Sequence, residues 1–417
     1  MKKLKLHFLL NPGSRVIFLL LFSFSLMNPQ ELPRVELGNE IFIKNFPSEL
    51  EGKRLGLIIN QTSFLPQGKP LLQALLELQK KVTAIFSPEH GYSGEIEGGK
   101  LVEDVLKGDI KIYSLYGKTK RPSSEQMKEI DAFIYDIQDV GTRFYTYITT
   151  LKYVLEAAAQ ARIPVYVLDR PNPCGGVIVE GPLLAPEYES FIGALPIPIR
   201  YGLTVGELAM MMKGEGWVAK EVELHIYKMN NWQRHFFWKN TGLKWIPPSP
   251  NMPSPKTAII YPGTGLLGAL RINPGLGTLN PFLQLGAPWL KTETLLKKLN
   301  QGKSYGIELE PIDYTPRSLL GKTLHPPYEN RLCHGIKVII KEEEKFYALK
   351  FVLDLINILH ELNQKEILPY SNQLNLMFGK KHLADFLEGK IEFDSLKKEI
   401  EKDEKIFQKK RAPYLLY

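Results

Sequence analysis

Residues 131–150 read DAFIYDIQDVGTRFYTYITT, and this stretch decides the fold. It opens with the apolar run 132–135, which has the length and composition of a strand buried on both faces. Asp136, Gln138 and Asp139 follow at once, and after a glycine the chain continues in a helical pattern. A buried strand, a polar turn and a helix in this order are typical of a sheet whose parallel strands alternate with helices.

Three further apolar runs end in polar residues in the same way, at 55–59, 82–86 and 164–168. The groups that follow them are Asn60, then Glu89 and His90, then Asp169, Arg170 and Asn172. The carboxyl ends of parallel strands lie along one edge of a sheet, and ligands bind in the crevice outside that edge. We therefore expect these side chains and those of residues 136–139 to share one polar cleft.

The alternation of strands and helices runs from about residue 54 to residue 227. The segment 245–255, WIPPSPNMPSP, then holds five prolines, which exclude a helix or a central strand and suit a connector. Beyond it come short strands, Pro/Gly turns and an amphipathic helix at 346–362. We predict an α/β protein with a Rossmann-like parallel-sheet domain (31–244), which carries the catalytic edge, and a smaller α/β C-terminal domain (245–417).

The first thirty residues differ from the rest, because basic residues precede the short apolar segment 16–27. This segment is shorter than the roughly 20 residues that a membrane-spanning helix needs. A positive flank and a short apolar core are typical of an export signal, and an uncleaved membrane anchor is the alternative. We expect the body of the protein to be periplasmic or secreted, with membrane attachment through residues 1–30 as an open alternative.

The composition argues against several classes of partner and cofactor. Lys and Arg number 53 against 45 Asp and Glu, and the two signs are mixed along the chain, so no nucleic-acid binding is expected. The glycines after Glu89 lack the spacing of a dinucleotide-binding fingerprint. Cys174 and Cys333 are too few and too far apart to predict a disulfide framework or a metal site. We predict no cofactor and no metal.

Glu89 is the leading catalytic candidate, because it lies between Pro88 and His90 at the end of a buried strand. A carboxylic acid held there can donate a proton to a leaving group. Asp136, Asp139 and Asp169 are candidates for a second carboxylate that stays ionised, with Asp136 and Asp139 the catalytic choices. Two carboxylates are the usual equipment for cleaving a glycosidic bond. The alternative is a divalent metal held by acidic groups and His90, although no HxH, HExxH or DxD spacing supports it.

Nine motifs identify the family that this sequence resembles. They are SPEHG (87–91), YDIQDVGTRFYTY (135–147), LDRPNPCGG (168–176), EGPLL (180–184), GLTVGELA (202–209), PPSPNMP (247–253), YPGT (261–264), GAPW (286–289) and YLLY (414–417). These motifs resemble those of the NamZ-type exo-β-N-acetylmuramidases, and the resemblance extends over nearly the whole chain after residue 55. These proteins are secreted or periplasmic glycosidases of cell-wall recycling that were formerly known only as a domain of unknown function.

The resemblance implies a Rossmann-like domain, a smaller C-terminal domain and an active-site cleft between them. It also implies release of N-acetylmuramic acid from the non-reducing end of peptidoglycan fragments, without metal or nucleotide. Glu89 matches the glutamate of the SPEHG motif. The candidate substrate-binding residues are His90, Arg143, Tyr145, Asp169, Arg170, Asn172 and Asn251.

The two arginines have a chemical reason to be in that set. Muramic acid bears a lactyl carboxylate, and a guanidinium binds a carboxylate through two parallel hydrogen bonds. Arg143 and Arg170 both follow predicted strands. The alternative is that each arginine pairs with its neighbouring aspartate, Asp139 or Asp169.

The sequence also departs from the family pattern. Gly268 and Pro274 stand where the family usually has glutamates, Leu276 where it has an arginine, and Tyr201 where a histidine is frequent. The loss of two carboxylates and a guanidinium would shift the substrate, relocate the role of the second carboxylate or abolish catalysis. The second hypothesis is therefore a protein that binds cell-wall sugars in the same cleft and has impaired catalysis.

Overall fold

The computed structural model describes residues 33–108, 110–301, 305–362, 366–367 and 372–417. The expected export signal or anchor at residues 1–30 lies outside this part. Residues Arg34–Tyr417 form one compact unit. The boundary that the sequence places at residue 245 therefore stays a prediction.

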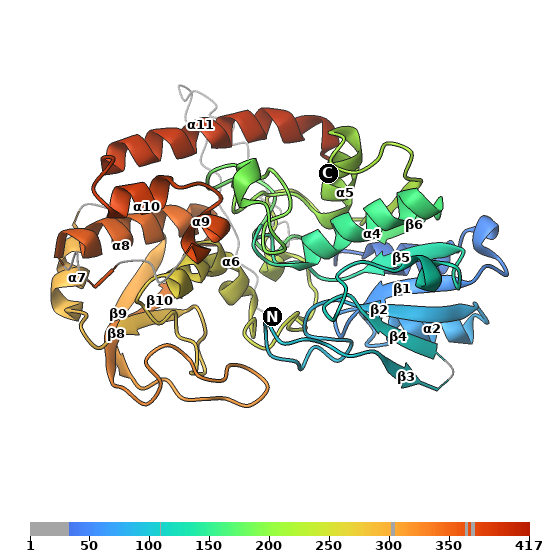
Figure 1. The fold of residues 1–417 in the computed structure, drawn as a ribbon, viewed down its shortest axis with the longest axis horizontal. Helices are drawn as coiled ribbons and strands as arrows, with labels where there is room; N and C mark the ends of the chain where they lie inside the picture. Colours follow the sequence, from blue (N-terminus) through green and yellow to red (C-terminus); the bar gives the residue numbers. More distant parts are fainter. Residues whose placement is uncertain (1–32, 109, 302–304, 363–365, 368–371) are drawn as a thin grey trace, which may run out of the picture. The chain divides into compact units, whose positions relative to one another are not determined.

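The larger sheet has seven strands in the order β3-β4-β2-β1-β5-β6-β7 (Figure 1). Six of them run parallel, and the short edge strand β3 (Val105–Lys107), which the sequence did not predict, pairs antiparallel with β4. The parallel strands are β1 (Leu55–Ile59), β2 (Val82–Ser87), β4 (Ile110–Ser114), β5 (Ala132–Asp136), β6 (Val165–Leu168) and β7 (Leu224–Tyr227). This sheet confirms the predicted α/β class.

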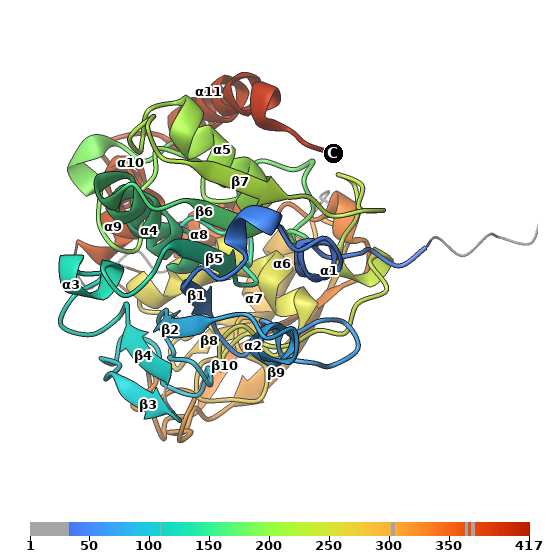
Figure 2. The ribbon, with the colours of Figure 1, turned by 90° about the vertical axis from the view of Figure 1, so that its right-hand side faces the viewer.

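Helices cover both faces of this sheet (Figure 2). Along β5, Phe133 and Tyr135 join the cluster with α4 (Tyr147–Ala161) and α5 (Val205–Gly214), as strand alternation requires. Ala132 and Ile134 point to the other face, toward α1 (Gly38–Lys44) and α2 (Leu71–Glu77). The short helix α3 (Ser124–Met127) precedes β5. Because both faces are covered, the polar residues after each strand are left at the carboxyl edge.

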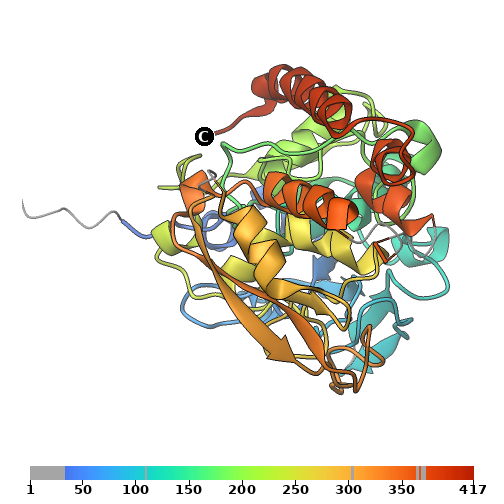
Figure 3. The same ribbon diagram turned by 90° about the vertical axis from the view of Figure 1, so that its left-hand side faces the viewer.

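The smaller sheet is antiparallel, in the order β8-β10-β9, and helix α7 packs on it (Figure 3). Its strands are β8 (Gln284–Ala287), β9 (Ile307–Tyr314) and β10 (Cys333–Ile340). The helices of this region are α6 (Pro255–Thr264), α7 (Thr292–Leu299), α8 (Ala348–Leu362), α9 (Gln373–Phe378), α10 (His382–Leu387) and α11 (Phe393–Arg411). The sequence suggests turns where α6 lies, because Pro262 sits inside this helix. Ser254 caps it and Pro255 begins it, which is a normal helix start.

Helix α11 and the C-terminal residues connect the two sheet regions (Figure 1). Arg411, at the end of α11, donates hydrogen bonds to the carbonyl oxygens of Gly176 and Gly202. The Tyr417 hydroxyl lies 2.7 Å from Asp169 Oδ2, beyond the end of β6. None of the described helices combines the length and the apolar character that crossing a bilayer demands.

Candidate active site

A cavity of about 240 Å³ lies between residues of the two sheet regions. The loop after β2 contributes Glu89 and His90, and the segment before α4 contributes Tyr145 and Thr146. Both the connector and the C-terminal region supply the rest of the wall, including Ser249, Asn251, Tyr261, Phe282, Gln373 and Met377. The cavity is close to the small end of ligand pockets, about 300–1,000 Å³.

Glu89 is held in this cavity by hydrogen bonds to both of its carboxylate oxygens. The backbone N–H of Gly99 donates to Oε1 over 2.8 Å, and Thr146 Oγ1 donates to Oε2 over 2.6 Å. Glu89 is 8% exposed, so the group is close to solvent yet fixed in orientation. Among the described residues that line the cavity, it is the only carboxylate.

The loop after Glu89 owes its course to two residues in the left-handed region, His90 at φ 71° and Gly91 at φ 75°. The ring nitrogen His90 Nδ1 lies 2.6 Å from the carbonyl oxygen of Ile96, which ties the loop back on itself. His90 therefore lines the cavity with a ring whose orientation the loop already fixes. This placement agrees with a structural role and leaves its other ring nitrogen for a ligand.

Tyrosines surround the carboxylate. Burial, followed by the adjacent Glu89 carboxylate, raises the pKa of Tyr116 to about 12, and the same two causes raise that of Tyr261. Tyr145 packs edge-on against Tyr147, and the Tyr147 hydroxyl donates to the carbonyl oxygen of Pro248 over 2.5 Å. These neutral hydroxyls surround Glu89 with dipoles and attach the proline connector to α4.

Asn251 brings part of the C-terminal region to the cavity. Its Nδ2 donates to Thr323 Oγ1 over 2.9 Å and to the carbonyl oxygen of Lys322 over 3.1 Å. Glu97, from the loop after β2, accepts a hydrogen bond from the backbone N–H of Leu324. The two loops therefore contact each other next to the cavity. Asn251 was predicted from the sequence as a substrate-binding residue, but no local pattern predicts the contact with residues 322–324.

Asp136 and Arg170 form a buried bidentate ion pair outside the Glu89 cavity. Arg170 Nε lies 2.5 Å from Asp136 Oδ1, and Arg170 Nη2 lies 3.0 Å from Asp136 Oδ2. Asn39 Nδ2 donates to the same carboxylate over 3.1 Å. The alternative in which Arg170 pairs with its neighbour Asp169 is wrong, because strand β5 places Asp136 opposite the end of β6.

Asp139 and Asp169 bind backbone and hydroxyl groups instead of lining the Glu89 cavity. Asp139 accepts hydrogen bonds from Gly141 N and from the hydroxyl of Tyr201, the residue that replaces the family's frequent histidine. Asp169 accepts from Gly206 N, Thr204 Oγ1 and Tyr417 OH. Burial raises the pKa of each carboxyl to about 6. The geometry brings neither carboxylate to Glu89.

Arg143 is fully buried, and its guanidinium binds backbone oxygens only. Nη1 donates to Pro182 O and Ile197 O, and Nη2 donates to Met377 O and Phe378 O, over 2.6–2.9 Å. Burial lowers its pKa to about 9. The alternative partner Asp139 forms no hydrogen bond with this arginine among the described residues, and four backbone oxygens occupy both terminal nitrogens. Asn172 is likewise structural, since it bridges Leu203 O and Cys174 N.

Gly268 and Pro274, two of the altered family positions, are not among the described lining residues of the cavity. Gly268 belongs to the 3-10 helix η4 (Gly265–Ala269), and a Cβ built there meets no heavy atom within 4 Å. Pro274 is buried, and its carbonyl oxygen accepts from Phe282 N over 2.7 Å. The open space at Gly268 leaves room for a longer side chain.

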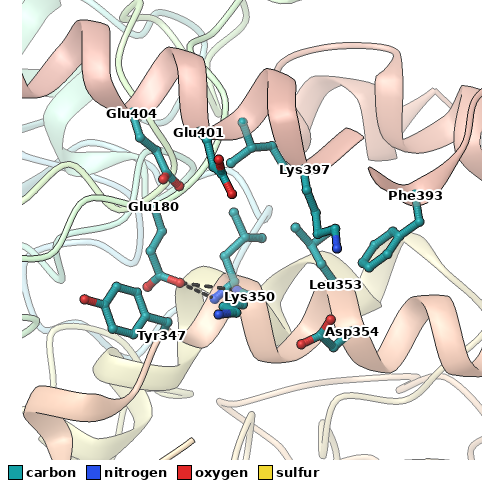
Figure 4. Close-up of a pocket in the computed structure, with 11 residues that line it drawn as sticks. Glu180, Tyr347, Lys350, Leu353, Asp354, Phe393, Lys397, Glu401 and Glu404 are labelled. Carbon is teal, nitrogen blue, oxygen red and sulfur yellow. Dashed lines mark hydrogen bonds between the residues drawn. The ribbon is translucent and has the colours of Figure 1, made fainter. Parts of the chain in front are cut away.

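A second cavity, of about 260 Å³, lies between α8 and α11 (Figure 4). Glu180 reaches the start of α8, where it accepts from the backbone N–H of Leu349 over 2.9 Å, and Arg200 Nη1 lies 3.1 Å from its other oxygen. Burial raises the pKa of Glu404 in the same cavity to about 7. None of the site residues predicted from the sequence lines this cavity.

The cysteines and possible metal ligands are readily placed. Cys174 and Cys333 are both buried and free. Within the described ranges, no three His, Cys, Asp or Glu side chains gather in a way that suits a metal ion.

Comparison with known proteins decides the family. The profile of the N-terminal domain of exo-β-N-acetylmuramidase NamZ matches residues 55–256, and that of the C-terminal domain matches residues 259–417. This chain belongs to the NamZ family. It is 37% identical over 389 residues to the peptidoglycan β-N-acetylmuramidase NamZ of Bacillus subtilis (strain 168), with 92% of each protein covered.

Two crystal structures of DUF1343 family proteins from Bacteroides fragilis share the NamZ-family fold seen here. One superposes with a TM-score of 0.84 at 32% identity, and the other with 0.75 at 34%. Each alignment covers 92% of this chain and 99% of the other. The resemblance read from the nine motifs is thereby confirmed.

Proposed function

We propose that this protein is an exported glycoside hydrolase that releases N-acetylmuramic acid from the non-reducing end of peptidoglycan fragments. The family assignment supports the reaction class, and the 37% identical Bacillus relative is a peptidoglycan β-N-acetylmuramidase. The observation that carries the proposal is the position of Glu89, a carboxylate anchored at both oxygens in a small cavity. A cavity of this size admits one sugar ring, which suits removal of a terminal residue.

Glu89 takes the acid/base role in this proposal. It protonates the glycosidic oxygen as the bond to the leaving sugar breaks, and its anchored orientation keeps that proton on a defined path. Tyr145 and Tyr261 form apolar ring surfaces in the same cavity, and ring faces of this kind pack against sugars. Asn251 and His90 supply polar contacts for hydroxyl or acetamide groups.

The lining of the same cavity supports a proposal for the nucleophile. Asp136, Asp139 and Asp169 are engaged elsewhere, so no described lining residue offers a second carboxylate. Some glycosidases of N-acetylated sugars use the substrate itself in place of an enzyme nucleophile. We propose that the acetamide oxygen of the muramic acid attacks its own anomeric carbon, while Glu89 acts first as acid and then as base toward water.

A hydrolysis assay tests the proposal. Purified protein and its Glu89→Gln variant are incubated with a chromogenic β-N-acetylmuramide, and with the matching β-N-acetylglucosaminide as the control substrate. The wild type should hydrolyse the muramide only, and the variant should bind the muramide without hydrolysing it. Muramide binding without turnover by both proteins would favour the alternative of a sugar-binding protein.

Export is the second part of the proposal and rests on residues 1–30, with their basic flank and apolar core. Fractionation of cells that express the full chain should recover it outside the cytoplasm or attached to a membrane. Deletion of residues 1–30 should leave it in the cytoplasm. Equal cytoplasmic amounts of both forms would contradict export.

A further inference from the structure

A third cavity, of about 330 Å³, lies at a position where α/β sheets commonly bind ligands and has no role in the proposed hydrolysis. We call it the switch-point cavity, and its polar lining residues are Thr62, Gln138, Arg170 and Lys244. The chain leaves β1 toward β2 on one side and later returns to β5 on the other side. Ligands bind outside the carboxyl ends of the strands at such a reversal.

The switch-point cavity is distinct from the Glu89 cavity. The two share no described lining residue, and the proline connector passes between them, with Ile246 facing one and Ser249 the other. Gln61 Nε2 donates to the carbonyl oxygen of Pro247 over 2.9 Å, and Tyr147 OH donates to that of Pro248. These two hydrogen bonds fix the connector as a wall between the cavities.

The cations of the switch-point cavity outnumber its acids. Asp136 occupies Nε and Nη2 of Arg170, and the remaining nitrogen, Nη1, has no hydrogen-bond partner among the described residues. Lys244 is exposed and forms no ion pair within the described chain. The described lining thus holds two cations and no carboxylate, and Asp136 neutralises only Arg170. The remaining positive charge favours an anionic ligand.

Gln138 adds a buried acceptor that lacks a donor. Its Nε2 donates to the carbonyl oxygens of Asp139 and Pro171, each over 2.8 Å, and this pair of acceptors fixes which end of the amide is nitrogen. Its Oε1 is buried and has no partner among the described residues. An unsatisfied buried acceptor costs about 1–3 kcal/mol, which a ligand N–H or O–H group would offset. Gln138 and Arg170 line the same cavity, so one ligand can contact both.

The remaining wall is apolar and includes Phe64 and Trp238. Trp238 Nε1 is already satisfied by the carbonyl oxygen of Leu243, over 3.1 Å, so the indole offers only its ring surface. A ligand for this cavity therefore combines an apolar side chain, a carboxylate and a nearby hydrogen-bond donor.

We infer that the switch-point cavity binds an N-acylated amino acid with an apolar side chain, as found at the carboxyl end of a peptide. The carboxylate lies against Arg170 Nη1 and Lys244, the amide N–H donates to Gln138 Oε1, and the side chain packs on Trp238 and Phe64. This inference does not depend on the proposed hydrolysis.

Calorimetry with three matched probes tests the inference on the full-length protein. The probes are N-acetyl-L-phenylalanine, its C-terminal amide, which lacks the carboxylate, and 3-phenylpropionate, which lacks the amide N–H. The amide should bind at least about tenfold more weakly, because hydrogen bonds to a charged group are lost. The phenylpropionate should bind about two- to tenfold more weakly, for the loss of one neutral hydrogen bond. Equal affinity for all three, or no heat at millimolar concentration, would overturn the inference.

Charge-reversal variants test whether the probe binds in the switch-point cavity. Lys244→Glu should weaken the binding of N-acetyl-L-phenylalanine by about two- to fivefold, which is the scale of one exposed ion pair. Lys228→Glu makes the same charge change outside the cavity and should leave the affinity unchanged. Glu89→Gln should bind the probe as the wild type does. Equal effects of the two lysine variants, or loss of binding in Glu89→Gln, would overturn the assignment to this cavity.

Discussion

Thr146 Oγ1 lies 2.6 Å from Glu89 Oε2, so the residue that precedes α4 holds the carboxylate that follows β2. The backbone N–H of Gly99 holds the other oxygen. Two elements far apart in the chain thus orient one acid, and this makes Thr146 a positioning residue for the proposed reaction.

Replacing that hydroxyl should reduce turnover without loss of the fold. Thr146→Val should lower kcat about tenfold with little change in KM. A misoriented acid loses part of the rate enhancement of about 10²–10⁴-fold that proton transfer contributes. Thr149→Val is the matched control, since Thr149 Oγ1 is buried on the same helix and has no described partner. Steady-state kinetics on the chromogenic muramide separates the two; equal kcat values for both variants would exclude the positioning role.

The acetamide nucleophile predicts a strong substrate effect. Successive fluorination of the N-acetyl group makes its oxygen less nucleophilic, so log kcat should fall steadily from acetyl to difluoroacetyl to trifluoroacetyl. The same series on an enzyme that uses its own carboxylate shows a weak dependence. If kcat does not change along the series, the nucleophile is a protein carboxylate and not the acetamide. Asp139 and Asp136 would then be the first residues to test.

Arg143 is expected to stabilise the fold instead of binding substrate. Arg143→Met should lower the free energy of unfolding by about 3–5 kcal/mol, because four carbonyl oxygens lose their donors in a buried site. Arg143→Lys keeps the charge but not the forked geometry and should recover only part of that loss. Urea unfolding gives the values. A Met variant of normal stability with a raised KM would instead support a contact with the lactyl carboxylate.

Glu404 should make stability depend on pH. Burial raises its pKa from 4.5 to about 7, so the folded state binds this proton more tightly than the unfolded state. This contribution is complete below about pH 4.5 and is lost as the pH rises toward 7. Glu404→Gln keeps an acceptor for Gly181 N and carries no charge, so it should be more stable than the wild type at pH 8 by about 1–2 kcal/mol, after allowance for partial exposure.

Urea unfolding of this variant at pH 4.5 and pH 8 provides the measurement. Glu399→Gln is the matched control, because Glu399 lies on the same helix with a 43% exposed side chain. If Glu404→Gln is no more stable than the wild type at pH 8, ionisation of Glu404 in the folded protein does not lower the free energy of unfolding, and the prediction is wrong.

Much of the larger sheet was predictable from sequence, because its strands are buried on both faces and appear as short apolar runs. The runs at 55–59, 82–86 and 132–135 match β1, β2 and β5 to within a residue or two. The Thr204–Glu207 capping box also starts α5 as its spacing indicates. The short antiparallel edge strand β3 and the proline-containing α6 were missed, because local signals there are weak or point to turns.

The site was harder to predict than the sheet. Strand ends did place Glu89, Asp136 and Asp169 along one edge, but side-chain partners decide which groups face a cavity. Asp136 forms an ion pair with Arg170, and Asp169 accepts a hydrogen bond from the C-terminal Tyr417, 248 residues away. Such long-range pairings leave no trace in local sequence. The cavity residues Tyr261, Phe282 and Met377 come from the second region and were missed for the same reason.

The most direct test of the central proposal is the release of free N-acetylmuramic acid from a muramyl disaccharide, followed by chromatography for wild type and Glu89→Gln. We expect the wild type to release the sugar from the non-reducing end only, and the variant to lose at least about 10²-fold of that rate while it still binds the disaccharide. A Glu89→Gln variant that releases N-acetylmuramic acid at the wild-type rate would contradict the account.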